Sequence, residues 1–125
     1  MHYLVAQGTL CRVVAASEVL SQLRRGALEY CVLALLANEE RYAFDIVRTL
    51  GQVDGMVTAE GTLYPLLSRL KKDGRVTTQW RDSDAGPPRK YYAITDDGRR
   101  ALGEFTTEWT RFRQAVESLL AKGTA

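Results

Sequence analysis

The clearest pattern in the chain lies in residues 58–74, where leucines recur at the spacing of one helix face. The leucines that share this face are Leu63, Leu66, Leu67 and Leu70. Their i, i+3, i+4, i+7 spacing predicts an amphipathic helix with this side buried. Thr58 is suited to cap the start of the helix, and Gly74 to end it. Pro65 falls inside, where proline removes a backbone hydrogen bond, so the regular helix either starts nearer Gly61 or bends at the proline.

The opposite side of this helix carries hydrogen-bond donors and positive charge. Tyr64, Ser68 and Lys72 recur every fourth residue, with Arg69 and Lys71 at the flanks. The DNA major groove is wide enough for one helix, and its base edges present distinguishable hydrogen-bond donors and acceptors. A helix with donors and positive charge on one side would suit this groove. An ordinary surface helix shows the same periodicity, because charged outer faces are common. The pattern alone therefore leaves both interpretations open.

Two further helices are predicted upstream. Residues 24–37 carry a wide apolar stripe made by Leu28, Cys31, Val32, Leu35 and Leu36. After a polar turn, a shorter stripe is made by Ala43, Ile46, Val47 and Leu50. Both follow the helical period, and Gly51 is placed to end the second helix. Residues 1–20 show no clean period; we interpret them as an extension, with Ser17 placed to cap a short helix through Leu23.

After Gly74 the period becomes alternating. Residues 76–81 and 89–95 alternate with a period of two, which predicts two half-buried strands. The intervening DSDAGPP is rich in turn formers and too long for a two-residue hairpin, so a long exposed tip is expected. Three helices followed by such a hairpin is the order of a winged helix-turn-helix. Arg89 and Lys90 lie where the tip rejoins the strand and are placed to reach phosphates or a minor groove, although hairpin charge often serves only solvation.

The last segment predicts one long helix. Thr95 is a good N-cap, and Asp96 and Asp97 suit the positive end of the helix dipole. Apolar residues then follow spacings of three and four, as in a coiled-coil seam: Leu102, Phe105, Trp109, Phe112, Val116 and Leu119. A helix over residues 96–122 would extend roughly 40 Å, more than its own domain can cover. The seam therefore predicts a homodimer that pairs along this helix.

Composition removes several classes of function. The 125-residue chain is sized for one domain, and no apolar run approaches the roughly 18 residues of a membrane span. Cys11 and Cys31 have no motif spacing, which fits a reducing cytoplasm. His2 is the one histidine, which argues against most metal sites and most general-base catalysis. No nucleophile elbow, phosphate loop or metal motif is present, so we expect no enzyme, metal or cofactor. The net charge of +2 means that any nucleic-acid surface must arise from local clustering.

Three stretches resemble the PadR family of bacterial transcriptional regulators: LRRGALEYCVLALLANEERYAFDIV, GTLYPLLSRLKKDGRV and PPRKYYAITDDGRRAL. The resemblance covers Leu23 to about Leu120, with the motifs in matching order and spacing. The single long final helix is similar to that of the short-chain subfamily. The chain departs from the family in the residues before Leu23 and in the Asp-rich tip SDAGPP, which bears on the phosphate contacts of the wing.

The resemblance implies a cytoplasmic, homodimeric repressor that binds a palindromic double-stranded DNA operator. Members of the family are often released by a small molecule, and for this protein the resemblance implies a small aromatic or hydrophobic effector. Family DNA contacts come from the third helix, the start of the second and the wing, which here correspond to Tyr42, Thr62, Tyr64, Ser68, Arg69, Arg89, Lys90 and Tyr91. Trp109 matches a tryptophan that, in some members, stacks on flat ligands between protomers. Plain packing in the dimer seam is the alternative role for Trp109.

We therefore expect a mainly α protein with a small β-hairpin (α+β), a winged helix-turn-helix followed by a long C-terminal dimerisation helix. The expected divisions are an N-terminal extension (1–22), the DNA-binding domain (23–95), the dimerisation helix (96–122) and a tail (123–125). The alternative function is a winged helix that binds another protein and has no specific DNA role. Such a module would bind DNA with little preference for any sequence.

Overall fold

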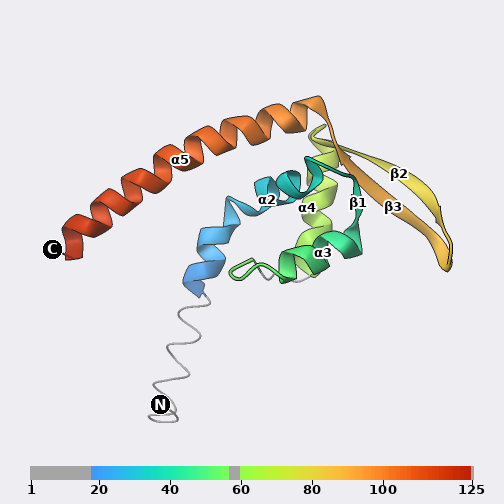
Figure 1. The fold of residues 1–125 in the computed structure, drawn as a ribbon, viewed down its shortest axis with the longest axis horizontal. Helices are drawn as coiled ribbons and strands as arrows, with labels where there is room; N and C mark the ends of the chain where they lie inside the picture. The colour runs from blue at the N-terminus through green and yellow to red at the C-terminus, as the bar shows by residue number, and fades with distance from the viewer. Residues whose placement is uncertain (1–17, 57–59, 125) are drawn as a thin grey trace, which may run out of the picture.

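Helices α2, α3 and α4 pack around one apolar core, with a small sheet on one side and a long helix leaving the other (Figure 1). The computed structural model describes residues 18–56 and 60–124. Helical residues 18–25 precede α2 (Leu28–Leu36), β1 (Arg41–Tyr42), α3 (Ala43–Gly51), α4 (Glu60–Lys72), β2 (Val76–Ser83), β3 (Gly86–Ile94) and α5 (Asp96–Thr124). The predicted fold class is confirmed. The predicted caps Ser17 and Thr58, and most of the N-terminal extension, lie outside the described residues.

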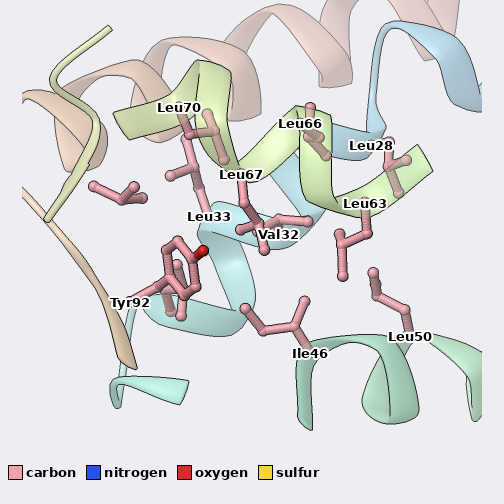
Figure 2. Packing of buried hydrophobic residues seen from close by; sticks show 12 residues of the cluster. Leu28, Val32, Leu33, Ile46, Leu50, Leu63, Leu66, Leu67, Leu70 and Tyr92 are labelled. Atoms are coloured by element: carbon pink, nitrogen blue, oxygen red, sulfur yellow. The ribbon is translucent and has the colours of Figure 1, made fainter. Parts of the chain in front are cut away.

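The core is built from the helix faces that the apolar spacing predicts. All four leucines of α4 are buried, and Ile46 and Leu50 of α3 face them (Figure 2). From α2 come Leu28, Val32, Leu33 and Leu36, and the sheet adds Val76 and Tyr92. Leu33 was not in the predicted stripe of α2. It is buried because α2 is covered by α4 on one side and by α5 on another.

The predicted start of the first core helix at Arg24 is wrong. Residues 18–25 form a separate helical segment, a turn follows at Gly26 and Ala27, and α2 begins at Leu28. The Ala27 N–H donates to the Arg24 carbonyl at 2.9 Å, the short i→i+3 bond of a turn. Glycine has a low helix propensity, which favours a break at this position.

Helix α4 is described from Glu60 onward, and the predicted start at Thr58 lies outside the described residues. Pro65 then lies in the second turn, where it removes only the bond that its nitrogen would donate to the Gly61 carbonyl. The helix ends as predicted at Gly74, which has a φ of 76°. The Gly74 N–H donates to Lys71 and the Arg75 N–H to Leu70, which together form a Schellman cap.

The sheet has three antiparallel strands in the order β1-β3-β2, one more than the predicted hairpin. Strand β1 is only two residues long and pairs with Tyr91 and Tyr92 of β3. The predicted long tip is wrong, because Ser83 pairs with Gly86 and only Asp84 and Ala85 form the loop. Proline is tolerated in the outer half of β3 because its far edge has no partner strand there. We call the β2–β3 hairpin the wing.

Helix α5 begins at the predicted cap. The Thr95 hydroxyl accepts the Gly98 N–H at 3.0 Å and donates to the Gly74 carbonyl at 2.7 Å, so it joins the start of α5 to the end of α4. The helix then continues for 29 residues, well past the packed helices (Figure 1). None of the described helices is long and apolar enough to cross a membrane.

Candidate nucleic-acid interface

A concave surface lies between the start of α3, the outer side of α4 and the wing, and it encloses a hollow with a volume of about 650 Å³. Its lining residues are Tyr42, Ala43, Phe44, Tyr64, Ser68, Trp80, Arg89, Lys90 and Tyr92. Of the eight residues predicted to contact DNA, this surface brings together five: Tyr42, Tyr64, Ser68, Arg89 and Lys90. Residues from three separate parts of the chain thus meet on one face. We refer to it as the concave surface.

Burial of the four α4 leucines sets how this helix is rotated. With that side against the core, Tyr64 is 45% exposed and Ser68 faces outward beside it. Thr62 and Arg69 are also exposed, but they do not line the concave surface. At about 100° per residue, they fall on the other flank of the helix from Tyr64. Any contact that they make would therefore come from that flank.

The wing is held against the start of α3 by aromatic contacts. The Arg89 guanidinium lies 4.4 Å from the centre of the Tyr42 ring, and Tyr91 meets the same ring edge-on at 5.5 Å. Tyr91 is itself covered by Arg81, 5.0 Å from its ring centre. Arg81 also forms an ion pair with Glu40, just before β1. Tyr91 is half-buried and does not line the concave surface, whereas Arg89 is exposed and does line it.

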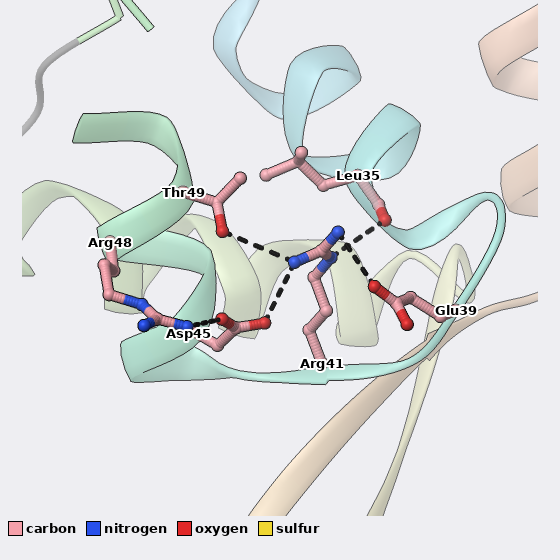
Figure 3. A network of polar contacts seen from close by, with 6 residues as sticks. All are labelled: Leu35, Glu39, Arg41, Asp45, Arg48 and Thr49. Carbon is pink, nitrogen blue, oxygen red and sulfur yellow. Dashed lines mark hydrogen bonds and ion pairs between the residues drawn. The ribbon is translucent and has the colours of Figure 1, made fainter. Parts of the chain in front are cut away.

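A polar network centred on Arg41 holds the turn between α2 and α3 (Figure 3). Its guanidinium donates to the Leu35 carbonyl at 3.2 Å and to the Asp45 carboxylate at 3.0 Å, and pairs with Glu39 at 3.0 Å. Arg48 binds the other oxygen of Asp45 at 2.7 Å. These bonds, that of Arg48 foremost, lower the pKa of Asp45 below its ordinary value. The network fixes the backbone that presents Tyr42, the next residue.

Positive charge gathers around the concave surface although the whole chain is nearly neutral. Arg89 and Lys90 lie on its wing side, and exposed Lys71 and Lys72 project from the last turn of α4. Cations spaced along a groove match the phosphates of a nucleic-acid backbone, which dominate its affinity for proteins. The acidic Asp84 lies in the wing loop, beyond these cations. Local clustering therefore supplies the charge that the composition does not.

Four lining residues were not predicted as DNA contacts: Ala43, Phe44, Trp80 and Tyr92. Phe44 is 57% exposed and Trp80 is 66% exposed, and both border the concave surface. The available signal for Phe44 was that it falls off the apolar stripe of its own helix. The alternating pattern of residues 76–81 predicted a half-buried strand that includes Trp80. In the structure, however, only Val76 of this strand, at the base of the wing, is buried, and Trp80 is exposed. Its exposure follows from how far the wing projects beyond the core.

The residues of the predicted seam divide into two groups along α5. Leu102 packs against the core, and Phe105 stacks on Tyr30 of α2 with ring centres 4.3 Å apart. Both therefore contact their own chain. Further along, Phe112 is 63% exposed and Leu119 is 67% exposed, on the part of α5 that extends past the packed helices. Val116 lies between them in the same predicted seam and is half-buried.

Trp109 lies at the division between these groups, beside a second, mostly apolar cavity of about 360 Å³. Its ring lies nearly parallel to that of Phe105, at 6.1 Å. The cavity is lined by Leu20, Leu23, Arg24, Ala27, Cys31, Asp54, Gly55, Met56, Phe105 and Trp109. Arg24 closes one side by donating to the Gly55 carbonyl at 3.0 Å. Burial raises the pKa of the Cys31 thiol, which therefore behaves as part of the apolar wall.

Comparison with known proteins identifies the family. The model of the PadR-like family of transcriptional regulators matches residues 32–104. The chain belongs to this family. The match runs from α2 through the wing to the first turns of α5, and so includes every element of the concave surface. The resemblance noted in the sequence is confirmed.

Relatives of this PadR-like protein share both sequence and fold. A PadR-like transcription factor from Bacteroides fragilis is 44% identical, with a TM-score of 0.67 over 82% of this chain and 98% of the other. A PadR family regulator from Eggerthella lenta is 34% identical, with a TM-score of 0.79 over 89% and 96%. A transcriptional regulator of Mycobacterium tuberculosis is 33% identical over 98 residues, which span 78% of this chain and 83% of that protein.

Proposed function

We propose that this PadR-like regulator is a cytoplasmic homodimeric repressor that binds a palindromic operator in double-stranded DNA. The observation that carries the proposal is the concave surface, where the outer side of α4 stands between the wing and the start of α3. A helix flanked in this way enters the major groove, while the wing and the start of α3 contact phosphates on either side. Tyr64 and Ser68 contact base edges or backbone, and Arg89 and Lys90 bind phosphates.

The exposed residues of α5 support the proposed dimer. Phe112 and Leu119 are both more than 60% exposed on a helix that extends past its own domain. Pairing of two such helices about a two-fold axis buries both copies of this surface at once. The same axis places two α4 helices in successive major grooves, so the operator has matching half-sites about one helical turn apart.

The cavity beside Trp109 gives the regulator a place to bind an effector. Its lining is mostly apolar, and the exposed face of the Trp109 indole suits a flat aromatic or hydrophobic molecule. Because α5 forms one wall, an occupant that prefers one arrangement of the α5 pair shifts the separation of the two α4 helices. DNA affinity then falls because the two α4 helices no longer match the spacing of successive major grooves, although no contact residue has been removed. The promoter becomes accessible.

The test is a mobility shift with the DNA just upstream of this protein's own gene, repeated across a salt series. We expect binding at least tenfold tighter than to a random duplex of equal length, with affinity that falls steeply as salt rises. A protein-interaction module without a specific DNA role would show neither the preference nor the steep slope. That outcome would replace the proposed function with the alternative.

Single substitutions separate DNA contact from dimerisation. Lys90→Ala and Arg69→Ala each remove one charge near α4, and we expect weaker operator binding and a salt slope smaller by about one per lost phosphate contact. The sedimentation behaviour of both variants should match that of the wild type. Arg111→Ala is the matched control, because its side chain is 82% exposed on α5, away from the concave surface. Unchanged operator affinity in both test variants would remove the DNA-facing assignment.

A further inference from the structure

The concave surface exposes more aromatic carbon than phosphate binding requires. Phe44 from α3, Tyr64 from α4 and Trp80 from β2 are 57%, 45% and 66% exposed, and all three line it. They come from three elements and surround the same hollow. Large exposed apolar side chains gathered at one place indicate a surface that is covered when the protein works.

Phe44 is the most informative of the three because its side chain has no polar atom. Helix α3 packs through Ile46 and Leu50, which are 0% and 3% exposed, and Phe44 lies off that side. It therefore has no role in holding the core together. Unlike Tyr64 or Trp80, it cannot donate a hydrogen bond to a phosphate or a base.

Duplex DNA offers few apolar groups to such a side chain. In the major groove each base pair presents hydrogen-bonding atoms, and thymine adds the C5-methyl group. Covering a phosphate or a polar base edge with a phenyl ring removes water without replacing its hydrogen bonds, which is unfavourable. Covering a methyl group is favourable, and burial of one such group corresponds to roughly fourfold in affinity.

We infer that the concave surface recognises thymine through its 5-methyl group, with Phe44 as a specificity-determining residue and Tyr64 and Trp80 beside it. The inference rests on the proposed function, since it names what the same surface recognises in its operator. The cations support DNA over an apolar protein partner as the occupant. Arg89 and Lys90 line the same hollow, and duplex DNA presents both methyl groups and phosphates.

The experiment replaces thymine by deoxyuridine, one position at a time, in the upstream duplex used for the mobility shift. Deoxyuridine pairs with adenine as thymine does and lacks only the methyl group. We expect a three- to tenfold loss of affinity at one or two positions in each half-site, and no change elsewhere. Phe44→Ala should weaken binding to the thymine duplex by a similar factor and remove the response to deoxyuridine at those positions.

Two further variants complete the design. Phe44→Leu keeps an apolar side chain and should retain the response, whereas Val53→Ala, which alters an exposed residue outside the concave surface, should leave both affinity and response unchanged. Circular dichroism and sedimentation check that Phe44→Ala keeps its fold and its oligomeric state. Phe44 is already exposed, so both should match the wild type.

The outcomes distinguish this inference from the proposed function. Specific operator binding with no response to deoxyuridine at any position would overturn the inference and leave the proposed function intact. Equal weakening of operator and random duplex by Phe44→Ala would also overturn it, because the ring would then contact the sugar-phosphate backbone. Absence of any operator preference in the wild type would instead reject the proposed function.

Discussion

Replacement of Gly98 by alanine tests how closely α5 is joined to the rest of the domain. A Cβ at this position would lie 2.2 Å from the Arg75 carbonyl oxygen and 2.8 Å from Cγ1 of Ile94. Ordinary contacts to a methyl carbon are about 3.5 Å or longer. The Arg75 oxygen accepts the Thr95 N–H at 3.0 Å, so it cannot retreat without loss of that bond.

The size of the effect follows from three contributions. Overpacking of this kind costs about 1–3 kcal/mol, and loss of the Thr95 bond adds about 1 kcal/mol. Alanine recovers about 0.5–1 kcal/mol, because glycine is the poorer helix former. We therefore expect Gly98→Ala to lower the free energy of unfolding by about 1–3.5 kcal/mol. Urea unfolding followed by circular dichroism measures this, at one fixed protein concentration so that the proposed dimerisation affects all samples equally.

Gly103→Ala is the matched control, because it makes the same change in the same helix. No atom lies within 4 Å of a Cβ built at Gly103. This variant should be more stable than the wild type by about 0.5–1 kcal/mol. If Gly98→Ala proved as stable as Gly103→Ala, the close contact between α5 and Arg75 would not exist, and the reasoning would be refuted.

Three further predictions concern the Arg41 network and the α5 seam. Asp45→Asn should reduce the free energy of unfolding most above pH 4, because the lowered pKa of Asp45 means that its charged carboxylate stabilises the folded state. As the pH falls and the carboxylate is protonated, the difference from the wild type should vanish. Urea unfolding across a pH series measures this, and a difference that does not depend on pH would contradict it. Arg41→Met should lower the free energy of unfolding in urea by about 1–3 kcal/mol, because the Arg41 side chain is only 20% exposed and its guanidinium hydrogen-bonds the α2–α3 turn. An unchanged unfolding midpoint would show that the network does not stabilise the fold. Phe112→Glu should shift the protein towards monomer in sedimentation, whereas Gln114→Glu, on the opposite side of α5, should not; equal behaviour would reject the seam.

Sequence periodicity correctly predicted the parts of the fold that depend on local signals within a single helix or strand. The α4 leucines and the Thr95 cap were located correctly because helical spacing and capping are local signals. Strand β1 was missed because two residues carry no period and pair only once Tyr91 and Tyr92 are in place. The wing loop was predicted too long because its prolines indicated a turn, whereas an unpaired strand edge tolerates them.

The candidate site shows the same distinction. The family resemblance predicted DNA contacts at Tyr64, Ser68, Arg89 and Lys90, and in the structure these four side chains lie together on the concave surface. Phe44 was missed because its position off the apolar stripe of α3 indicates exposure but not that its side chain meets α4 and the wing on one surface. Phe105 was assigned to the dimer seam by its spacing, but the spacing cannot distinguish a partner's helix from α2 of the same chain.

The hydrogen bonds of Thr95 join the end of α4 to the start of α5, so we expect the two helices to move together as one lever. The Thr95 hydroxyl bonds both the end of α4 and the first turn of α5, and Gly98 lets the two backbones touch. A lever of about 40 Å that pivots by about 5° moves its far end by about 3.5 Å, close to the rise of one base-pair step. In a pair joined along α5, a small change of tilt would thus put the two reading helices out of phase with the duplex.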